Sequence, residues 1–195
     1  MFISGLLFLH RGNFIHRDIK AANILIDERA NESTNQKDAI YKIADFGLAT
    51  KLNRRKDLKT VCGTKRFMAP EMTGYTEYGP EVDIWSLGVL FFSLLVGKHP
   101  TVDSTKVEIY EPIKSAYQKP IYPKDLGISE DTQTLVNKML EVDPMLRISI
   151  DNIQSTLSTY TKYPKSPATN RTISDSGIAS SYSSRSAGQG LLLLY

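Results

Sequence analysis

The sequence predicts an α+β fold that is mostly α-helical and carries one small β-hairpin near its start. Residues 82–96, VDIWSLGVLFFSLLV, are apolar on nearly all sides, which is typical of a helix buried at the centre of a domain. They are fewer than the ~20 residues that cross a bilayer. Residues 129–142 place apolar side chains at helical spacing behind Ser129, which suits the N-cap position. Two short β-prone runs, 24–26 and 41–43, flank a polar stretch and predict a hairpin with a long loop.

The remaining helices are expected at the two ends of this region. Residues 2–14 fit the end of a helix that packs through its leucines. No basic segment precedes this apolar run and no small-residue cleavage site follows it, so a packed helix is favoured over a signal peptide. A shorter helix is expected over residues 149–160. Gly97 is the expected C-cap of the central helix, and a proline follows soon after it.

Composition divides the chain near residue 160 into one domain, residues 1–160, and a tail, residues 161–195. Eleven of the 35 tail residues are Ser or Thr, and aliphatic residues are few before the last five. Such a segment cannot offset the entropy lost on ordering, so the tail is predicted to be disordered.

The charge and the cysteine content indicate which cellular compartment and which classes of partner are expected. The chain has 195 residues, 41% of them apolar, and a formal charge of +3, which is ordinary for a globular protein and names no partner. A single cysteine, Cys62, excludes an internal disulfide and favours a reducing compartment, so a cytoplasmic location is expected. The short basic cluster at residues 51–59 suits a loop that faces phosphate or substrate, and neither nucleic acid nor membrane is an expected partner.

Two short motifs carry the residue types that phosphoryl transfer needs. That reaction requires a carboxylate to orient the attacking hydroxyl, oxygen ligands for Mg²⁺ and cations for the phosphates. Residues 16–23, HRDIKAAN, hold Asp18 and Asn23 at the spacing H-R-D-x-x-x-x-N, and DFG at residues 45–47 adds Asp45. Either motif alone arises often by chance, so neither decides the function.

The joint order of four motifs is far more specific. APE at residues 69–71 and DIWSLG at residues 83–88 follow the first two in sequence. Over residues 1–160 the chain therefore resembles the eukaryotic protein kinases. The resemblance implies a protein-kinase-like fold in which these residues form the mostly helical C-terminal lobe. It also implies ATP and Mg²⁺ as cofactors and proteins as substrates.

The resemblance assigns roles at the matching positions. Asp18 corresponds to the catalytic base, and Asn23 and Asp45 correspond to the ligands of Mg²⁺. Lys20 corresponds to the lysine that Ser/Thr kinases direct at the γ-phosphate, which favours Ser and Thr over Tyr as the acceptor. Thr64 corresponds to the threonine that hydrogen-bonds both the base and this lysine.

The resemblance also implies a switch and structural residues in the segment that follows DFG. Thr60 resembles the phosphorylated threonine of T-L-C-G-T kinases, and Arg17 resembles the arginine that binds such a phosphate. The alternative is that Thr60 is only an exposed loop residue. Glu71 and Arg147 resemble the buried ion pair that ties the segment to the lobe, and Asp83 is expected to be structural.

Finer features resemble the polo-like kinases, and within them the Sak-type branch that controls centriole duplication. Ser176 and Ser180, in DSGIAS, match a degron read by an F-box ubiquitin ligase once both serines are phosphorylated. Such a kinase would act at the centrosome and centriole. Two features depart from this branch: KRF at residues 65–67 replaces its proline-containing form, and residues 28–38 form an insertion.

The position of HRDIKAAN leaves the activity of these 195 residues open. Only fifteen residues precede His16, and they contain no Gly-rich loop, strand lysine or partner glutamate of an N-terminal lobe. An inactive fragment of an active Ser/Thr kinase is expected. A short product that acts as a non-catalytic binding or regulatory module is the alternative, and a small lobe supplied by another chain is a third reading.

Overall fold

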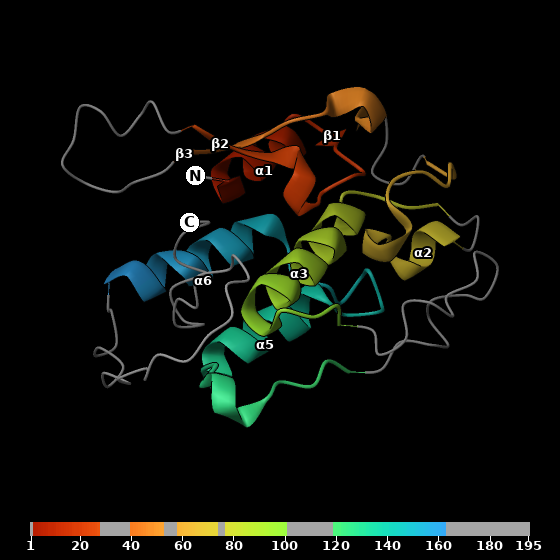
Figure 1. Ribbon diagram of the computed structural model, residues 1–195. Helices are drawn as coiled ribbons and strands as arrows, with labels where there is room; N and C mark the ends of the chain where they lie inside the picture. The colour runs from red at the N-terminus through yellow and green to blue at the C-terminus, as the bar shows by residue number, and fades with distance from the viewer. Residues whose placement is uncertain (1, 28–39, 53–57, 74–76, 101–118, 163–195) are drawn as a thin grey trace, which may run out of the picture.

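The computed structural model describes residues 2–27, 40–52, 58–73, 77–100 and 119–162 (Figure 1). The insertion at residues 28–38 and the serines of the predicted degron, Ser176 and Ser180, lie outside the described residues. Among the described elements are five α-helices: α1 (Phe2–Arg11), α2 (Pro70–Thr73), α3 (Glu81–Val96), α5 (Glu130–Met139) and α6 (Ile150–Lys162). The strands are β1 (Phe14–Ile15), β2 (Ile24–Asp27), β3 (Ile40–Ile43) and β4 (Thr50–Lys51).

Helix α3 passes through the middle of the described fold in Figure 1, with α5 against one side. Its sequence is apolar on nearly all sides, and most of its residues are buried, including Trp85 and Phe91. Gly97 ends the helix in a left-handed conformation and donates its N–H to Ser93 O, so the predicted C-cap is confirmed. No helix within the described ranges is both long and apolar enough to span a membrane.

Helix α1 packs on α6, β1 and β3, and leads directly into the loop that carries HRDIKAAN. Leu6 and Leu7 are buried, as the prediction of a packed helix requires. The helix ends at Arg11, before the predicted end at residue 14, because Asn13 adopts a left-handed conformation and the chain continues into β1. The antiparallel pairing of β1 with β4 was not predicted, because strands of two residues show no periodicity in the sequence.

The predicted hairpin is confirmed: β2 and β3 are antiparallel, with Ile24 opposite Ile43 and Asp27 opposite Ile40. Helix α5 begins as predicted, because the Ser129 side chain accepts from the N–H of Thr132. It ends at Met139, three residues before the predicted end.

Candidate active site

The loop of residues 16–23, HRDIKAAN, is called the catalytic loop below, and one buried carboxylate at the start of α3 holds it in place. Oδ1 of Asp83 accepts the backbone N–H of Arg17 at 2.8 Å, and Oδ2 accepts the backbone N–H of His16, also at 2.8 Å. The Nε2 atom of His10 donates to Oδ2 at 2.9 Å. Because Asp83 is fully buried and belongs to the central helix, its hydrogen bonds fix the loop relative to the core of the domain.

The loop presents Asp18 in a network of charged and polar groups. Nζ of Lys20 donates to Oδ2 of Asp18 at 2.7 Å and to Oγ1 of Thr64 at 2.8 Å. Thr64 donates to Oδ1 of Asp18 twice, from its hydroxyl at 2.7 Å and from its N–H at 3.0 Å. Asn23 donates from Nδ2 to Asp18, to the backbone oxygen at 2.8 Å and to Oδ2 at 3.1 Å. The structure therefore brings together Asp18, Lys20, Asn23 and Thr64, from segments more than forty residues apart in sequence.

These contacts keep Asp18 ionised. Burial by itself would raise the pKa of the carboxyl, but the hydrogen bonds and the charge of Lys20, with those from Thr64 and Asn23, hold the pKa below its ordinary value. Asp18 therefore contributes stability above the pKa of the unfolded chain, and this contribution is lost as the pH falls through the lower folded pKa. An ionised carboxylate can orient a hydroxyl and accept its proton.

The turn that carries Asp45 is fixed through His16. The His16 ring donates from Nε2 to Ala44 O at 3.0 Å, and its Nδ1 accepts from the N–H of Asp18 at 3.3 Å, which assigns the proton to Nε2. Phe46 stacks edge-on against this ring, with 5.2 Å between the centroids. Asp45 itself adopts a left-handed conformation, with φ of 59°, and is exposed. The left-handed residue of this turn is therefore the first of DFG, and Gly47 has no positive φ.

The donor atoms of Asn23 and Asp45 suit a hard cation. The amide nitrogen of Asn23 points to Asp18, so its oxygen faces away from that carboxylate. One Asp45 oxygen accepts from the Gly47 N–H at 3.2 Å, and the exposed carboxylate keeps further acceptor capacity. In the described part of the chain, no three His, Cys, Asp or Glu side chains gather as a metal site. Two oxygen ligands still fit Mg²⁺, which takes few protein ligands and completes its shell with water and substrate phosphates.

The segment from DFG to APE, residues 45–71, is called the activation segment below, and Gly63 lets it approach the catalytic loop closely. Its φ is +100°, and a Cβ atom at this position would lie 2.4 Å from the backbone oxygen of Arg17. Only glycine tolerates both the conformation and the contact. The next residue is Thr64, so the close approach sets the distance between Thr64 and Asp18.

Replacing Gly63 with Ala is expected to destabilise the domain by about 1–3 kcal/mol, because the added methyl group meets backbone that cannot yield. Gly97→Ala is the matched control, since Gly97 also has a positive φ but its Cβ would meet nothing within 4 Å. Chemical denaturation of the two variants measures the difference. Equal losses of stability would mean that the contact with Arg17 is not restrictive.

Arg17 connects the catalytic loop to the activation segment. Its Nε donates to Leu48 O at 2.7 Å, and Nη1 donates to the Tyr78 hydroxyl at 3.3 Å. The same hydroxyl donates to Thr60 O at 2.6 Å. Thr60 is exposed, so its side chain is accessible to a modifying enzyme, and its role as a phosphosite stays a prediction.

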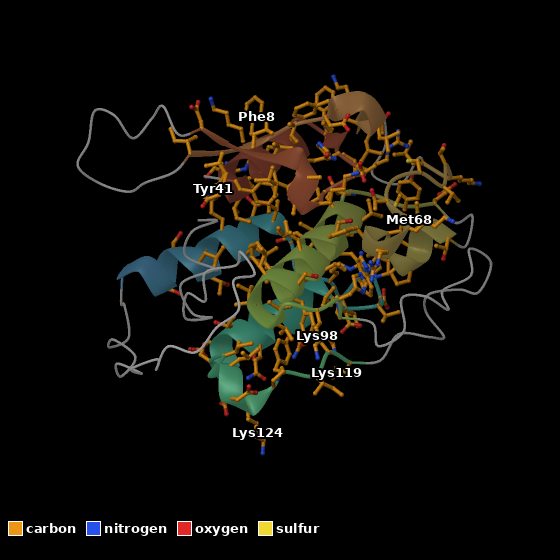
Figure 2. All side chains as sticks on the ribbon, in the orientation of Figure 1. Phe8, Tyr41, Met68, Lys98, Lys119 and Lys124 are labelled. Atoms are coloured by element: carbon orange, nitrogen blue, oxygen red, sulfur yellow. The ribbon has the colours of Figure 1, made fainter. Side chains whose placement is uncertain are left out.

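The far end of the activation segment is anchored by the expected ion pair. Arg147 forms a two-pronged contact with Glu71, with Nη1–Oε1 at 2.6 Å and Nη2–Oε2 at 3.0 Å. The Arg147 guanidinium also donates to backbone oxygens, including Glu81 O at 2.8 Å, and lies over the Trp85 ring. Met68, labelled in Figure 2, is buried just before α2, which begins at Pro70.

Sequence reasoning missed Tyr78, which holds this site, and did not foresee the contacts of Asp83. Tyr78 had no motif to mark it, although an aromatic residue shortly before a buried helix is a weak signal of a packed position. Asp83 was expected to be structural, but its three donors could not be named, because those contacts join positions 66, 67 and 73 residues apart.

Comparison with known proteins gives one consistent family. The model of the protein kinase domain matches residues 1–157. An SNF1-related protein kinase catalytic subunit alpha of Arabidopsis thaliana is 38% identical over 152 residues, which cover 78% of this chain and 28% of the relative. A probable serine/threonine-protein kinase of Zea mays is 40% identical over 153 residues, covering 77% of this chain and 23% of the relative.

The chain spans 28% and 23% of the length of these two curated relatives, and 21% of a probable serine/threonine-protein kinase of Dictyostelium discoideum. These names are SNF1-related or general, so they give no support to the polo-like branch that the motifs resemble. The match of the family model to most of the chain, together with the geometry around Asp18, leads to one conclusion: the chain belongs to the protein kinase family, and its relatives are of the Ser/Thr type.

Proposed function

We propose that these residues form the substrate-facing and metal-facing part of a serine/threonine protein kinase, which transfers a phosphoryl group from ATP to Ser or Thr hydroxyls of proteins. The observation that carries the proposal is the network in which Lys20 and Thr64 both bond Asp18. It joins the catalytic loop to the segment that would hold the substrate. It also favours the ionised form of the Asp18 carboxylate, which can orient a hydroxyl.

The network defines what Asp18 does when a substrate arrives. Each carboxylate oxygen already accepts two hydrogen bonds, and a carboxylate offers about four such positions. A substrate hydroxyl must therefore take the place of a present donor. The bond from Asn23 is the longest of the four, at 3.1 Å, and is the first expected to yield. Asp18 would then orient the hydroxyl and take its proton as the new P–O bond forms and the bond from the γ-phosphorus to the oxygen of the departing ADP breaks.

Two cofactors complete this proposal. When bound, ATP would supply the phosphoryl group and Mg²⁺ would offset its negative charge. Asn23 and Asp45 would hold Mg²⁺ through the oxygens described above. Lys20 would direct its ammonium group at the phosphate while remaining bonded to Asp18. The groups that grip the other end of ATP in kinases are not found in residues 1–195, so little transfer is expected from the purified 195-residue polypeptide.

The decisive comparison pairs this polypeptide with the product of the transcript extended upstream of the Met1 codon. If an in-frame Gly-rich loop and strand lysine are found there, the extended product should phosphorylate a Ser/Thr protein substrate with ATP and Mg²⁺. Asp18→Asn should lower its rate by about 10²–10⁴-fold, since positioned proton transfer contributes that much. Radiolabel transfer from ATP measures both.

Asp143→Asn is the matched control, because Asp143 is exposed and remote in sequence from the catalytic loop. It should leave the rate unchanged. Transfer by the 195-residue polypeptide alone, abolished in the Asp18 variant, would contradict the proposed inactivity. Transfer by the extended product that survives Asp18→Asn would contradict the role of Asp18. A stop codon shortly upstream would favour the alternative of a non-catalytic binding or regulatory module.

The branch, the regulation and the location stay proposals. The polo-like and Sak-type resemblance depends on short motifs, and the SNF1-related names of relatives give it no support. Two further proposals depend on that branch. One is that an F-box ubiquitin ligase binds phosphorylated Ser176 and Ser180, and the other is a centriolar location within the cytoplasm. The proposal that Thr60 is phosphorylated does not depend on that branch. The Tyr78 hydroxyl bonds both Arg17 and the backbone oxygen of Thr60, so Arg17 lies near Thr60.

A further inference from the structure

We propose that Tyr78 is a positioning residue of this site: its hydroxyl latches the activation segment to Arg17 and so keeps Thr64 on Asp18. The inference rests on the proposed function, since holding Thr64 matters for transfer only if Asp18 serves transfer. The latch joins three parts of the chain, namely the catalytic loop, the activation segment and the residues before α3.

The hydroxyl of Tyr78 is the shared atom of the latch. It donates to the backbone oxygen of Thr60 at 2.6 Å and accepts from Nη1 of Arg17 at 3.3 Å. The ring is buried, with 1% of its surface exposed, so the hydroxyl cannot exchange these partners for bulk water. Burial raises the pKa of the phenol, which keeps the proton that is donated to Thr60.

The backbone of Tyr78 fixes the same segment two residues earlier. Its N–H donates to Leu58 O at 3.0 Å, in an isolated antiparallel bridge between the two residues. The segment is thus held at Leu58 by backbone and at Thr60 by the side chain. Only Val61, Cys62 and Gly63 lie between Thr60 and Thr64, the residue that bonds Asp18. Gly63 is packed against the backbone of Arg17.

The hydrogen bonds of the latch use Arg17 and backbone oxygens of the activation segment. Arg17 is already positioned by the Asp83 carboxylate, by Leu48 O and by the Tyr78 hydroxyl. The Tyr78 hydroxyl bonds the backbone oxygen of Thr60 and leaves the threonine side chain out of the latch. Phosphorylation of Thr60 would then reinforce an arrangement that Tyr78 already favours, because a phosphate binds a preplaced guanidinium.

The test compares Tyr78→Phe with Tyr78→Leu in the 195-residue chain by amide hydrogen exchange. The readout is the N–H of Thr64, which Asp18 protects. Loss of the hydroxyl should raise its exchange rate by about 3- to 10-fold, the factor that one net hydrogen bond gives. Exchange in α3 should stay unchanged in Tyr78→Phe. Tyr122→Phe is the matched control, because the hydroxyl of that partly buried tyrosine donates to Asn137 Oδ1 at 3.0 Å.

Each outcome decides the proposal. If Tyr78→Phe raises Thr64 exchange as much as Tyr78→Leu does, the hydroxyl is the latch. If Phe behaves as wild type and only Leu raises exchange, Tyr78 acts through packing and the proposal fails. It also fails if Tyr78→Phe raises exchange equally in α3, or if Tyr122→Phe has the same effect on Thr64. The measurement needs no ATP, so a failure of phosphoryl transfer would leave its result standing.

Discussion

Replacing Arg147 with Met lowers the free energy of unfolding by about 3–5 kcal/mol, because Glu71 is left as a buried carboxylate without its cation. Neither partner can recover hydration: the side chain of Arg147 is fully buried, and that of Glu71 is 9% exposed. The variant also loses the donors to Glu81 O and Glu141 O. Equilibrium denaturation followed by circular dichroism measures the loss.

A second substitution separates the charge from the packing. Adding Glu71→Gln to Arg147→Met removes the carboxylate charge that Arg147 no longer offsets, so the double variant should be less destabilised than the sum of the single ones. The exposed ion pair of Arg11 with Asp151, at 2.8 Å, is the control, and Arg11→Ala should cost about 0.2–1 kcal/mol. A loss of similar size at both pairs would show that the burial of Arg147 has no energetic consequence.

The second large effect is expected at Asp83, where Asn should destabilise the domain by about 2–5 kcal/mol. The amide has one oxygen, whereas the two carboxylate oxygens accept from the N–H groups of Arg17 and His16. Whichever way the amide turns, its nitrogen faces one of these buried donors, which is then left without an acceptor. Thermal unfolding monitored by calorimetry measures the change.

The Asp83 variant should also move the site, which distinguishes it from a general loss of stability. The NMR signals of the His10 and His16 rings should shift in Asp83→Asn, since both residues contact the carboxylate directly. Arg147→Met should leave those signals in place. Asp143→Asn is the stability control: Asp143 is exposed, accepts from the Met145 N–H at 2.9 Å, and should cost under about 1 kcal/mol. Unchanged histidine signals in Asp83→Asn would contradict the anchoring role.

The sequence predicted the elements that have a local signal. The stretch from Val82 to Val96 is apolar all round, and Ser129 precedes a helical pattern, so both helices could be placed. The strands β1 and β4 have two residues each, and no periodicity marks them. Their pairing depends on tertiary contacts, which propensity does not carry.

The site divides in the same way. Asp18, Asn23 and Asp45 could be proposed as site residues because their spacing within short motifs matches what phosphoryl transfer requires. The role of Tyr78 could not, because it follows from a hydroxyl that meets Thr60 and Arg17 across 18 and 61 positions of the chain. Such contacts are properties of the fold, and a single sequence does not display them.

The pairing of Glu71 with Arg147 also bears on how the chain is made. These partners lie 76 positions apart, so during synthesis Glu71 emerges well before the residue that neutralises it. At about 5–20 residues per second, the delay is about 4–15 s. For that period Glu71 lacks the two-pronged contact that it makes with Arg147 in the folded domain. This contact is thus a late event in biosynthesis, timed by the synthesis of a single arginine.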